Sequence, residues 1–442
     1  MQRLDIWTTH TMLRSLYIIP IILVSFMSTL SAENWSQWRG PRGDSTSVET
    51  GIPLEWSKTK NVAWRLELPG SAGATPVIWE DRIFLTSAEE NDLVLMAVST
   101  AGKQLWKKKV ATGNKNARGG EGNSASASPS TDGKHVWCFF GTGDLACYTV
   151  DGEEVWSFNV QERYGRFDIQ FGMTSTPVLH QGNLYLQLIH GTMRSDYTVG
   201  KVIKLEAATG KEIWAVDRPS TATFECKHSY ASPFIYDDGK RSFIVTHGAD
   251  FTGGYSLEDG SELWRFAGLN GPSQYNSGKF DPTFRFVSSP GVVNGSIIIP
   301  SAKNGPSVAL KVTDDLKGDS TVNEKVVRWS QEKTSDVSIP IVYEGLVYFF
   351  RKDGRVFCID HDSGEELYYE RTHTSQHRSS PIVVDGHLIW CAKDGMCTVL
   401  KTGKEFGIVA QNKMEEPITA SPIVSNGTLY LRTYDALYAI KK

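Results

Sequence analysis

The 442-residue sequence lacks several features that would assign it to a common class of protein. Its 46 Lys and Arg residues nearly balance 50 Asp and Glu residues, and no basic block or stripe occurs, so nucleic acid is not an expected partner. The sequence has no Gly-x-Ser-x-Gly elbow, no P-loop and no His-Glu-x-x-His. It therefore offers no recognisable motif for acyl transfer, nucleotide binding or zinc catalysis.

Cysteine is scarce, and its six occurrences are never adjacent. No Cys-x-x-Cys-His is present, which argues against a covalently attached haem. A two-residue turn at residues 142–143 would place Cys138 opposite Cys147, and residues 393–395 separate Cys391 from Cys397 in a similar way. In an oxidising compartment either pair could form a disulfide, and buried free thiols are the alternative.

The N-terminus has the pattern of an export signal. Arg14 precedes an apolar run over residues 16–30, and the small residues Ser31 and Ala32 follow it. We expect a signal peptide over residues 1–32 and a periplasmic or secreted mature protein without further membrane insertion. The alternative is that the segment remains as an uncleaved anchor.

One pattern recurs eight times along the rest of the chain. A small residue and a Pro precede a short β-branched strand, then a tight turn and a second apolar strand. The turns are often Asp-Gly or Asn-Gly, which favour β-hairpins, and Pro suits the first position of a strand. The eight prolines are Pro76, Pro129, Pro177, Pro233, Pro290, Pro340, Pro381 and Pro422.

Most repeats then end in a strand that carries Trp four residues after a Gly, as at Gly210 and Trp214. Four short antiparallel strands per repeat predict an all-β fold, an eight-bladed β-propeller. The last repeat lacks its Trp strand, and we expect the strand around Trp64 to close the ring from the N-terminal side. The Trp residues expected to dock neighbouring blades are Trp64, Trp106, Trp156, Trp214, Trp264 and Trp329.

These repeats resemble the pyrroloquinoline-quinone-like (PQQ-like) β-propeller family over roughly residues 61–442. The resemblance implies one of two branches. Quinoprotein alcohol dehydrogenases hold the quinone and calcium in the central channel, against a disulfide between adjacent cysteines, which this sequence lacks. Cofactor-free scaffolds include the outer-membrane-assembly propeller lipoprotein, whose lipidated Cys has no counterpart before Cys138.

Residues 33–60 precede the repeats and form a leader in the expected domain order of signal (1–32), leader (33–60) and propeller (61–442). The leader contains Trp35, Trp38 and Arg39 in a pattern that resembles a segment found before some secreted propellers of this family. We interpret it as a strap that packs on the ring, with a docking tag as the alternative. Trp35 is expected to contribute less to stability than a Trp inside the ring.

Loop lengths indicate where the protein binds. The connections from each blade-closing aromatic to the next Pro all lie on one face, and the long ones serve blades two to five. Polar residues gather in these connections just before the strand nearest the channel. The candidate ligand-binding residues are Glu121, Asp168, Gln170, Lys227, His228, Arg285, Asp336, His377 and Arg378.

From the sequence we expect a binding or scaffold protein that uses this loop-rich face. Its partner would be an envelope protein or a polar small ligand, with no cofactor, no metal and no catalytic residue. A quinone-dependent oxidoreductase, or another enzyme using the channel mouth, is the alternative reading.

Overall fold

The computed structural model describes Met1 and residues 33–117, 120, 122–293 and 295–442. The expected signal peptide lies outside the described residues, apart from Met1. The chain divides into two compact units, and the second, Ala32–Lys442, holds all the strands described below. Among the described residues, no helix is long and apolar enough to span a membrane.

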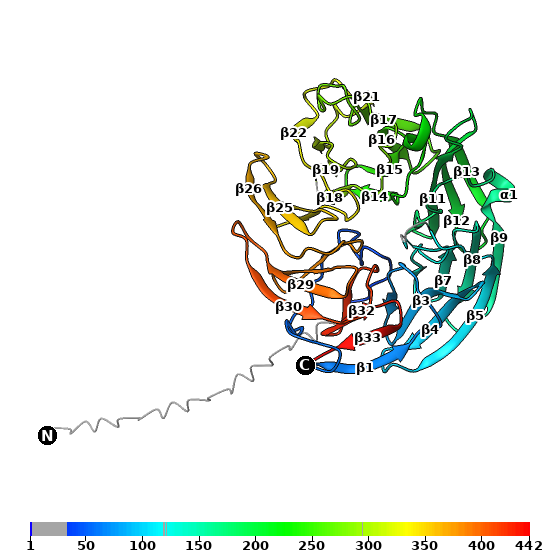
Figure 1. Ribbon diagram of the computed structural model, residues 1–442, viewed down its shortest axis with the longest axis vertical. Helices are drawn as coiled ribbons and strands as arrows, with labels where there is room; N and C mark the ends of the chain where they lie inside the picture. Colours follow the sequence, from blue (N-terminus) through cyan, green and yellow to red (C-terminus); the bar gives the residue numbers. More distant parts are fainter. Residues whose placement is uncertain (2–32, 118–119, 121, 294) are drawn as a thin grey trace. The chain divides into compact units, whose positions relative to one another are not determined.

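Residues 62–440 form eight antiparallel sheets, as predicted, and Figure 1 shows them in chain order around a central axis. We number these blades by their prolines, so that Pro76 opens blade 1 and Pro422 opens blade 8. Blade 1 contains β2 (Val77–Trp79), β3 (Arg82–Glu89), β4 (Asp92–Ser99) and β5 (Gln104–Thr112), and blade 2 contains β6 (Ser130–Thr131), β7 (His135–Phe139), β8 (Asp144–Thr149) and β9 (Glu154–Asn159). Blade 3 contains β10 (Val178–His180), β11 (Asn183–Gly191), β12 (Thr198–Glu206) and β13 (Glu212–Asp217), and blade 4 contains β14 (Phe234–Asp237), β15 (Ser242–Gly248), β16 (Phe251–Ser256) and β17 (Glu262–Ala267).

The other four blades repeat this order, and blade 8 takes its outermost strand from the N-terminal side of the chain. Blade 5 contains β18 (Gly291–Val293), β19 (Ser296–Ile299), β20 (Ser307–Lys311) and β22 (Val327–Gln331), and blade 6 contains β23 (Ile341–Tyr343), β24 (Leu346–Phe350), β25 (Arg355–Asp360) and β26 (Glu366–Arg371). Blade 7 contains β27 (Ile382–Val384), β28 (His387–Cys391), β29 (Met396–Lys401) and β30 (Ile408–Lys413), and blade 8 contains β31 (Ile423–Ser425), β32 (Thr428–Arg432), β33 (Ala436–Ile440) and β1 (Val62–Glu67).

The predicted closure by the Trp64 strand is confirmed, because β1 pairs antiparallel with β33. Where the structure describes the chain, three further short elements lie outside the four-strand pattern. A two-residue strand, β21 (Gly318–Asp319), adds to the outer edge of β17 in parallel. The connections to blades 3 and 4 contain α1 (Val160–Tyr164) and a 3₁₀ turn, η2 (Phe224–Lys227).

A belt of hydrogen bonds explains why Ser or Thr stands directly before seven of the eight prolines. Each of these seven hydroxyls accepts the backbone N–H of the same position in the preceding blade, at 2.8–3.3 Å. Blade 6 has Ile339 there, which donates its N–H but offers no hydroxyl in return. The belt residues are Thr75, Ser128, Thr176, Ser232, Ser289, Ser380 and Ser421.

Tryptophan and glycine explain how the outer parts of the blades meet. Trp156 in blade 2 donates its indole N–H to the Ala207 carbonyl in blade 3, and a Cβ on Gly210 of that blade would lie 2.8 Å from the indole. The same indole-on-glycine contact joins Trp64 to Gly102, Trp106 to Gly152, Trp214 to Gly260 and Trp329 to Gly364. Trp264 differs, because it lies over Gly254 of its own blade.

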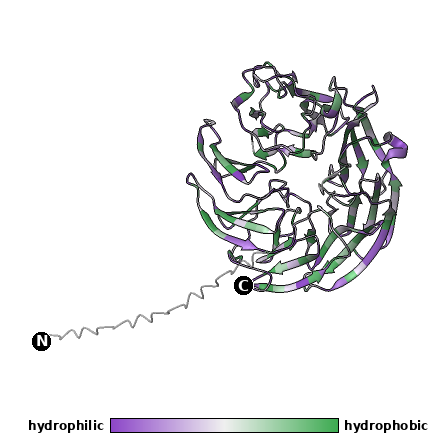
Figure 2. Cartoon of the chain, viewed as in Figure 1, coloured by the Kyte–Doolittle hydropathy of each residue, from purple (hydrophilic) through white to green (hydrophobic). Residues whose placement is uncertain are grey.

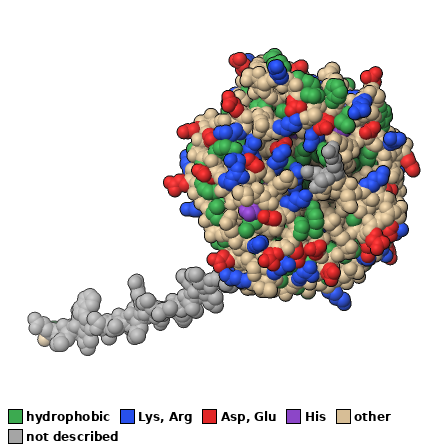
Figure 3. All heavy atoms as spheres, in the orientation of Figure 1, with side chains coloured by type: hydrophobic (Ala, Val, Ile, Leu, Met, Phe, Trp, Pro, Cys, Tyr) green, Lys and Arg blue, Asp and Glu red, His purple; other side chains and the backbone are tan. Residues whose placement is uncertain are grey.

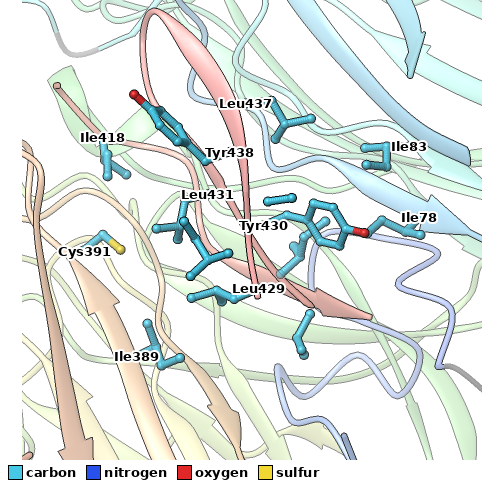
Figure 4. Close-up of a cluster of buried hydrophobic side chains, with 14 of the residues drawn as sticks. Ile78, Ile83, Ile389, Cys391, Ile418, Leu429, Tyr430, Leu431, Leu437 and Tyr438 are labelled. Carbon is cyan, nitrogen blue, oxygen red and sulfur yellow. The ribbon is translucent and has the colours of Figure 1, made fainter. Parts of the chain in front are cut away.

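Apolar side chains fill the space between sheets, whereas outer strands such as β5 expose polar ones, as the hydropathy colours in Figure 2 show. One large cluster joins blades 7, 8 and 1 and includes Ile389, Tyr430, Leu431 and Ile83 (Figure 4). Because this cluster spans the two ends of the ring, it packs across the closure.

The structure corrects the register expected for one cysteine pair. Cys138 lies opposite Ala146, and Cys147 opposite Trp137, so the hairpin is offset by one residue from a turn centred at 142–143. A one-residue shift moves a side chain to the other face of a sheet. Cys138 and Cys147 accordingly belong to different apolar clusters and cannot face each other.

Candidate functional site

One position of the repeat lines a cavity on the ring axis. The residue three places before each Pro contributes to the wall of a single cavity of about 400 Å³. Residues from all eight blades can meet only around the axis, so this cavity is the mouth of the central channel on the face of the blade-to-blade connections. These residues are Gly73, Ser126, Thr174, Tyr230, Val287, Val337, Arg378 and Thr419.

Charged side chains surround one side of this mouth. Arg285, Lys303, Lys352 and Arg378 line it, together with the carboxylate of Asp336. They come from the segments before and within blades 5, 6 and 7. Figure 3 shows a hollow near the centre of the face in view, with Lys and Arg side chains around it.

Carboxylates hold three of these cations in position. The Arg285 guanidinium lies 2.7 Å from Glu225, the Lys303 ammonium 2.5 Å from Asp281, and the Lys352 ammonium 2.6 Å from Asp336. Glu225 and Asp281 are not part of the cavity wall. The cationic groups therefore face the cavity while acids outside its wall orient two of them.

Asp336 links two of the lysines. Its Oδ1 accepts the backbone N–H of Lys303 at 2.8 Å, and its Oδ2 pairs with Lys352. Burial by itself would raise the pKa of the Asp336 carboxyl, but the hydrogen bond and charge of Lys352 outweigh burial and hold this pKa below its ordinary value. Asp336 is thus a carboxylate at neutral pH, with its charge directed at Lys352.

Aromatic side chains form another part of the wall. Phe171 and Tyr230 line the cavity with their rings 6.0 Å apart, and the Arg285 guanidinium lies 4.8 Å from the Phe171 centroid. Flat apolar surfaces beside fixed cations are suited to a ligand that has both an apolar body and an anionic or polar end.

The structure brings three of the nine candidate ligand residues together at this mouth: Arg285, Asp336 and Arg378. Glu121 lies outside the described residues. Gln170 borders a neighbouring hollow between the connections to blades 2 and 3. His377 is fully buried and stacks on Trp390 at 3.7 Å, so its ring faces the blade rather than the channel.

The remaining candidates brace the tip of blade 3. Asp168 accepts the hydroxyl of Thr192 at 2.7 Å, and Lys227 donates to the Ser195 carbonyl at 2.6 Å. His228 is buried with its Nε2 2.8 Å from the Gly191 carbonyl. These three side chains therefore hold the β11–β12 turn, and the structure does not place them on the axial cavity.

Sequence reasoning missed Lys303, Lys352 and Tyr230. The two lysines lie in turns between the second and third strands of blades 5 and 6. In a four-stranded antiparallel blade, this turn shares a face with the connection to the next blade. The sequence criterion considered only the blade-to-blade connections, so it did not include these two turns. The spacing of three residues before each Pro would have identified Tyr230.

The leader covers the other end of the channel. The Trp35 carbonyl accepts from Ile78 of blade 1, the Ser36 carbonyl from Thr131 of blade 2, and Arg39 donates to the Pro290 carbonyl before blade 5. Further along, residues 45–47 bond to Val383 of blade 7. Trp35 and Arg39 are almost completely buried, so the leader packs tightly into this end of the ring.

Comparisons with known proteins agree with this architecture. A family model described as outer membrane protein assembly factor BamB matches residues 54–191 and 91–368. Outer membrane protein assembly factor BamB of Yersinia pestis is 20% identical over 400 residues, covering 88% of this chain and 85% of its own length. The structure of BamB from Moraxella catarrhalis superposes with a TM-score of 0.60 at 12% identity, covering 86% of this chain and 97% of that one.

A europium-containing methanol dehydrogenase has a similar fold, with a TM-score of 0.61 at 12% identity, covering 91% of this chain and 90% of that one. Both branches of the PQQ-like propellers thus share this ring, and the side chains of the site must distinguish them.

Proposed function

Because the chain belongs to the PQQ-like propeller family described as outer membrane protein assembly factor BamB, we propose that it is an exported scaffold that binds another envelope protein. The binding surface is the loop-rich face around the axial cavity. A periplasmic location, after removal of residues 1–32, accords with both the N-terminal sequence and the family.

The charged wall of the axial cavity is the observation that carries this proposal. Fixed Arg and Lys side chains, aromatic rings and the eight converging blades make this mouth a recess into which a partner could insert an acidic or polar side chain. Electrostatic complementarity of this kind mainly sets specificity and orientation. The recess at the opposite end is smaller, about 290 Å³, and the leader forms part of its wall.

The experiment compares capture of envelope proteins by three forms of the chain. Arg285→Gln with Lys303→Gln removes two mouth cations, and Lys134→Gln with Lys240→Gln removes two exposed cations from hairpins of the opposite face. We expect the mouth variant to lose about tenfold in affinity, equivalent to ~1.4 kcal/mol, and the control to bind normally. Normal capture by the mouth variant together with loss in the control would refute the proposed face.

The alternative, a quinone-dependent oxidoreductase, fits these residues poorly. The six cysteines are buried and no two are consecutive in the sequence, so no disulfide between adjacent cysteines is available to pack on a quinone. Asp336, the carboxylate on the cavity wall, is already paired with Lys352. Dye-linked alcohol oxidation by protein mixed with quinone and calcium would reverse this assignment.

A further inference from the structure

We propose that Cys391 and Cys397 form a cross-strand disulfide that fixes the β28–β29 hairpin beneath the wall of the axial cavity. The two residues are direct partners in the β28–β29 ladder. Directly opposed Cα atoms in antiparallel strands lie ~4.5–5.5 Å apart, within the range of ~4.4–6.8 Å that a disulfide requires. Both side chains are fully buried in the same apolar cluster.

The two sulfur atoms are already neighbours. Burial, followed by the interaction with the Cys391 thiol, raises the pKa of Cys397 well above its ordinary value. Cys391 lies beside Ile389 and Ile418 in Figure 4. A disulfide could therefore form without a change of register or side-chain face.

Other blades show that packing alone does not require cysteine here. The equivalent partners are Phe350 and Val356 in blade 6, and Phe139 and Leu145 in blade 2. Both are apolar pairs without thiols. The pair Cys138 and Cys147 is a natural control, because its one-residue offset puts the sulfurs on opposite faces of the sheet.

The hairpin turn supports two segments of the cavity wall. The Lys393 N–H donates to the Gln376 carbonyl at 2.7 Å, and the Lys393 carbonyl accepts from Ile418. Gln376 and Arg378 on one side, and Thr419 on the other, line the cavity. A covalent link at the base of this turn would hold both wall segments in register.

The chemistry is thiol–disulfide exchange with a disulfide oxidant such as glutathione disulfide. One protein thiolate attacks the oxidant, forms a mixed disulfide and releases one glutathione thiol; the second protein thiolate then displaces the other. Two S–H bonds are lost, one S–S bond forms, and the oxidant gains the two electrons and two protons. Because the buried pair is inaccessible in the folded ring, exchange takes place in the nascent hairpin, before blade 7 packs.

The first test is refolding of the full chain in a glutathione redox buffer, followed by alkylation in denaturant and tryptic mapping. Lys393 lies between the two cysteines, so a disulfide would join peptide 379–393 to peptide 394–401. We expect this linked pair, with Cys138, Cys147, Cys226 and Cys358 alkylated. Alkylation of all six thiols, or a link between Cys138 and Cys147, would overturn the proposal. The result does not depend on export or on the proposed partner.

The second test separates a disulfide from a pair of apolar thiols. Cys391→Val with Cys397→Val keeps the apolar packing found in blade 6 but removes the sulfur. Dithiothreitol should lower the melting temperature of oxidised wild-type protein and leave that of the valine variant unchanged. Equal insensitivity of both proteins to reductant would contradict a stabilising disulfide.

Discussion

Single residues in each repeat have separable physical tasks. The Gly that precedes most outer strands is a clear case, because Gly210 adopts a φ of +68° and also receives the face of Trp156. Gly182 of the same blade has a φ of +73° but no atom within 4 Å of a Cβ position. The two glycines therefore share a backbone requirement and differ in the need for close approach.

This difference predicts unequal costs of alanine. Gly182→Ala should destabilise the fold by about 1 kcal/mol, from left-handed backbone strain alone. Gly210→Ala should cost a further ~1–3 kcal/mol, because its methyl group would overlap the indole of Trp156. Denaturant unfolding of both variants measures the difference. Equal losses would mean that Trp156 is not docked on this turn.

A buried histidine predicts how stability depends on pH. Burial lowers the pKa of His377 from 6.5 to about 4, so its neutral form is favoured in the fold. Its contribution is complete above about pH 6.5, the unfolded value, and is lost as the pH falls toward 4, at a cost of about 3 kcal/mol. His377→Gln should reduce the fall in unfolding free energy between pH 6.5 and 4. An unchanged slope would contradict this assignment.

At the scale of elements, both ends of the chain contribute to the eighth blade and its surroundings. β1 supplies the outer strand of blade 8, and the leader before it bonds to blades on several sides of the axis. The sequence suggested that Trp35 would matter less than a ring Trp. In the structure, however, the Trp35 side chain is completely buried in the cluster that joins blades 7, 8 and 1.

We predict that removing first the leader and then β1 lowers the melting temperature in two steps. A chain that begins at Asn61 keeps β1 and loses the leader, so it should fold with a lower melting temperature. A chain that begins at Gly70 also loses β1, exposes the edge of β33, and should aggregate or melt far lower. Similar melting of the two shortened chains would show that β1 does not close the ring.

Sequence patterns predicted the blades well because they repeat. Eight Pro-initiated hairpins and the orphan strand at Trp64 determined the blade count and the closure, which the β1–β33 pairing confirms. The cavity was harder to predict, because Lys303 and Lys352 come from second-to-third-strand turns whose face depends on the register of the sheet. The internal bonds of His228 and Lys227 also depend on tertiary contacts that no local pattern encodes.

At the scale of the whole molecule, the ring has two unlike faces. The leader and the first hairpins occupy one, and the blade connections and the charged axial cavity occupy the other. A scaffold needs a rigid, asymmetric surface of this kind, because a partner can then bind in one orientation. The hydroxyl belt and the Trp–Gly contacts supply rigidity, and the cavity supplies the asymmetry.

Site-specific photo-crosslinking in the native envelope tests this account most directly. A photoreactive side chain replaces either Gln376, which is exposed on the cavity wall, or Lys240, which is exposed on an opposite-face hairpin. If the loop-rich face binds the partner, position 376 should give a discrete adduct with one envelope protein and position 240 should give none. An adduct with a discrete partner from position 240, and none from position 376, would contradict it.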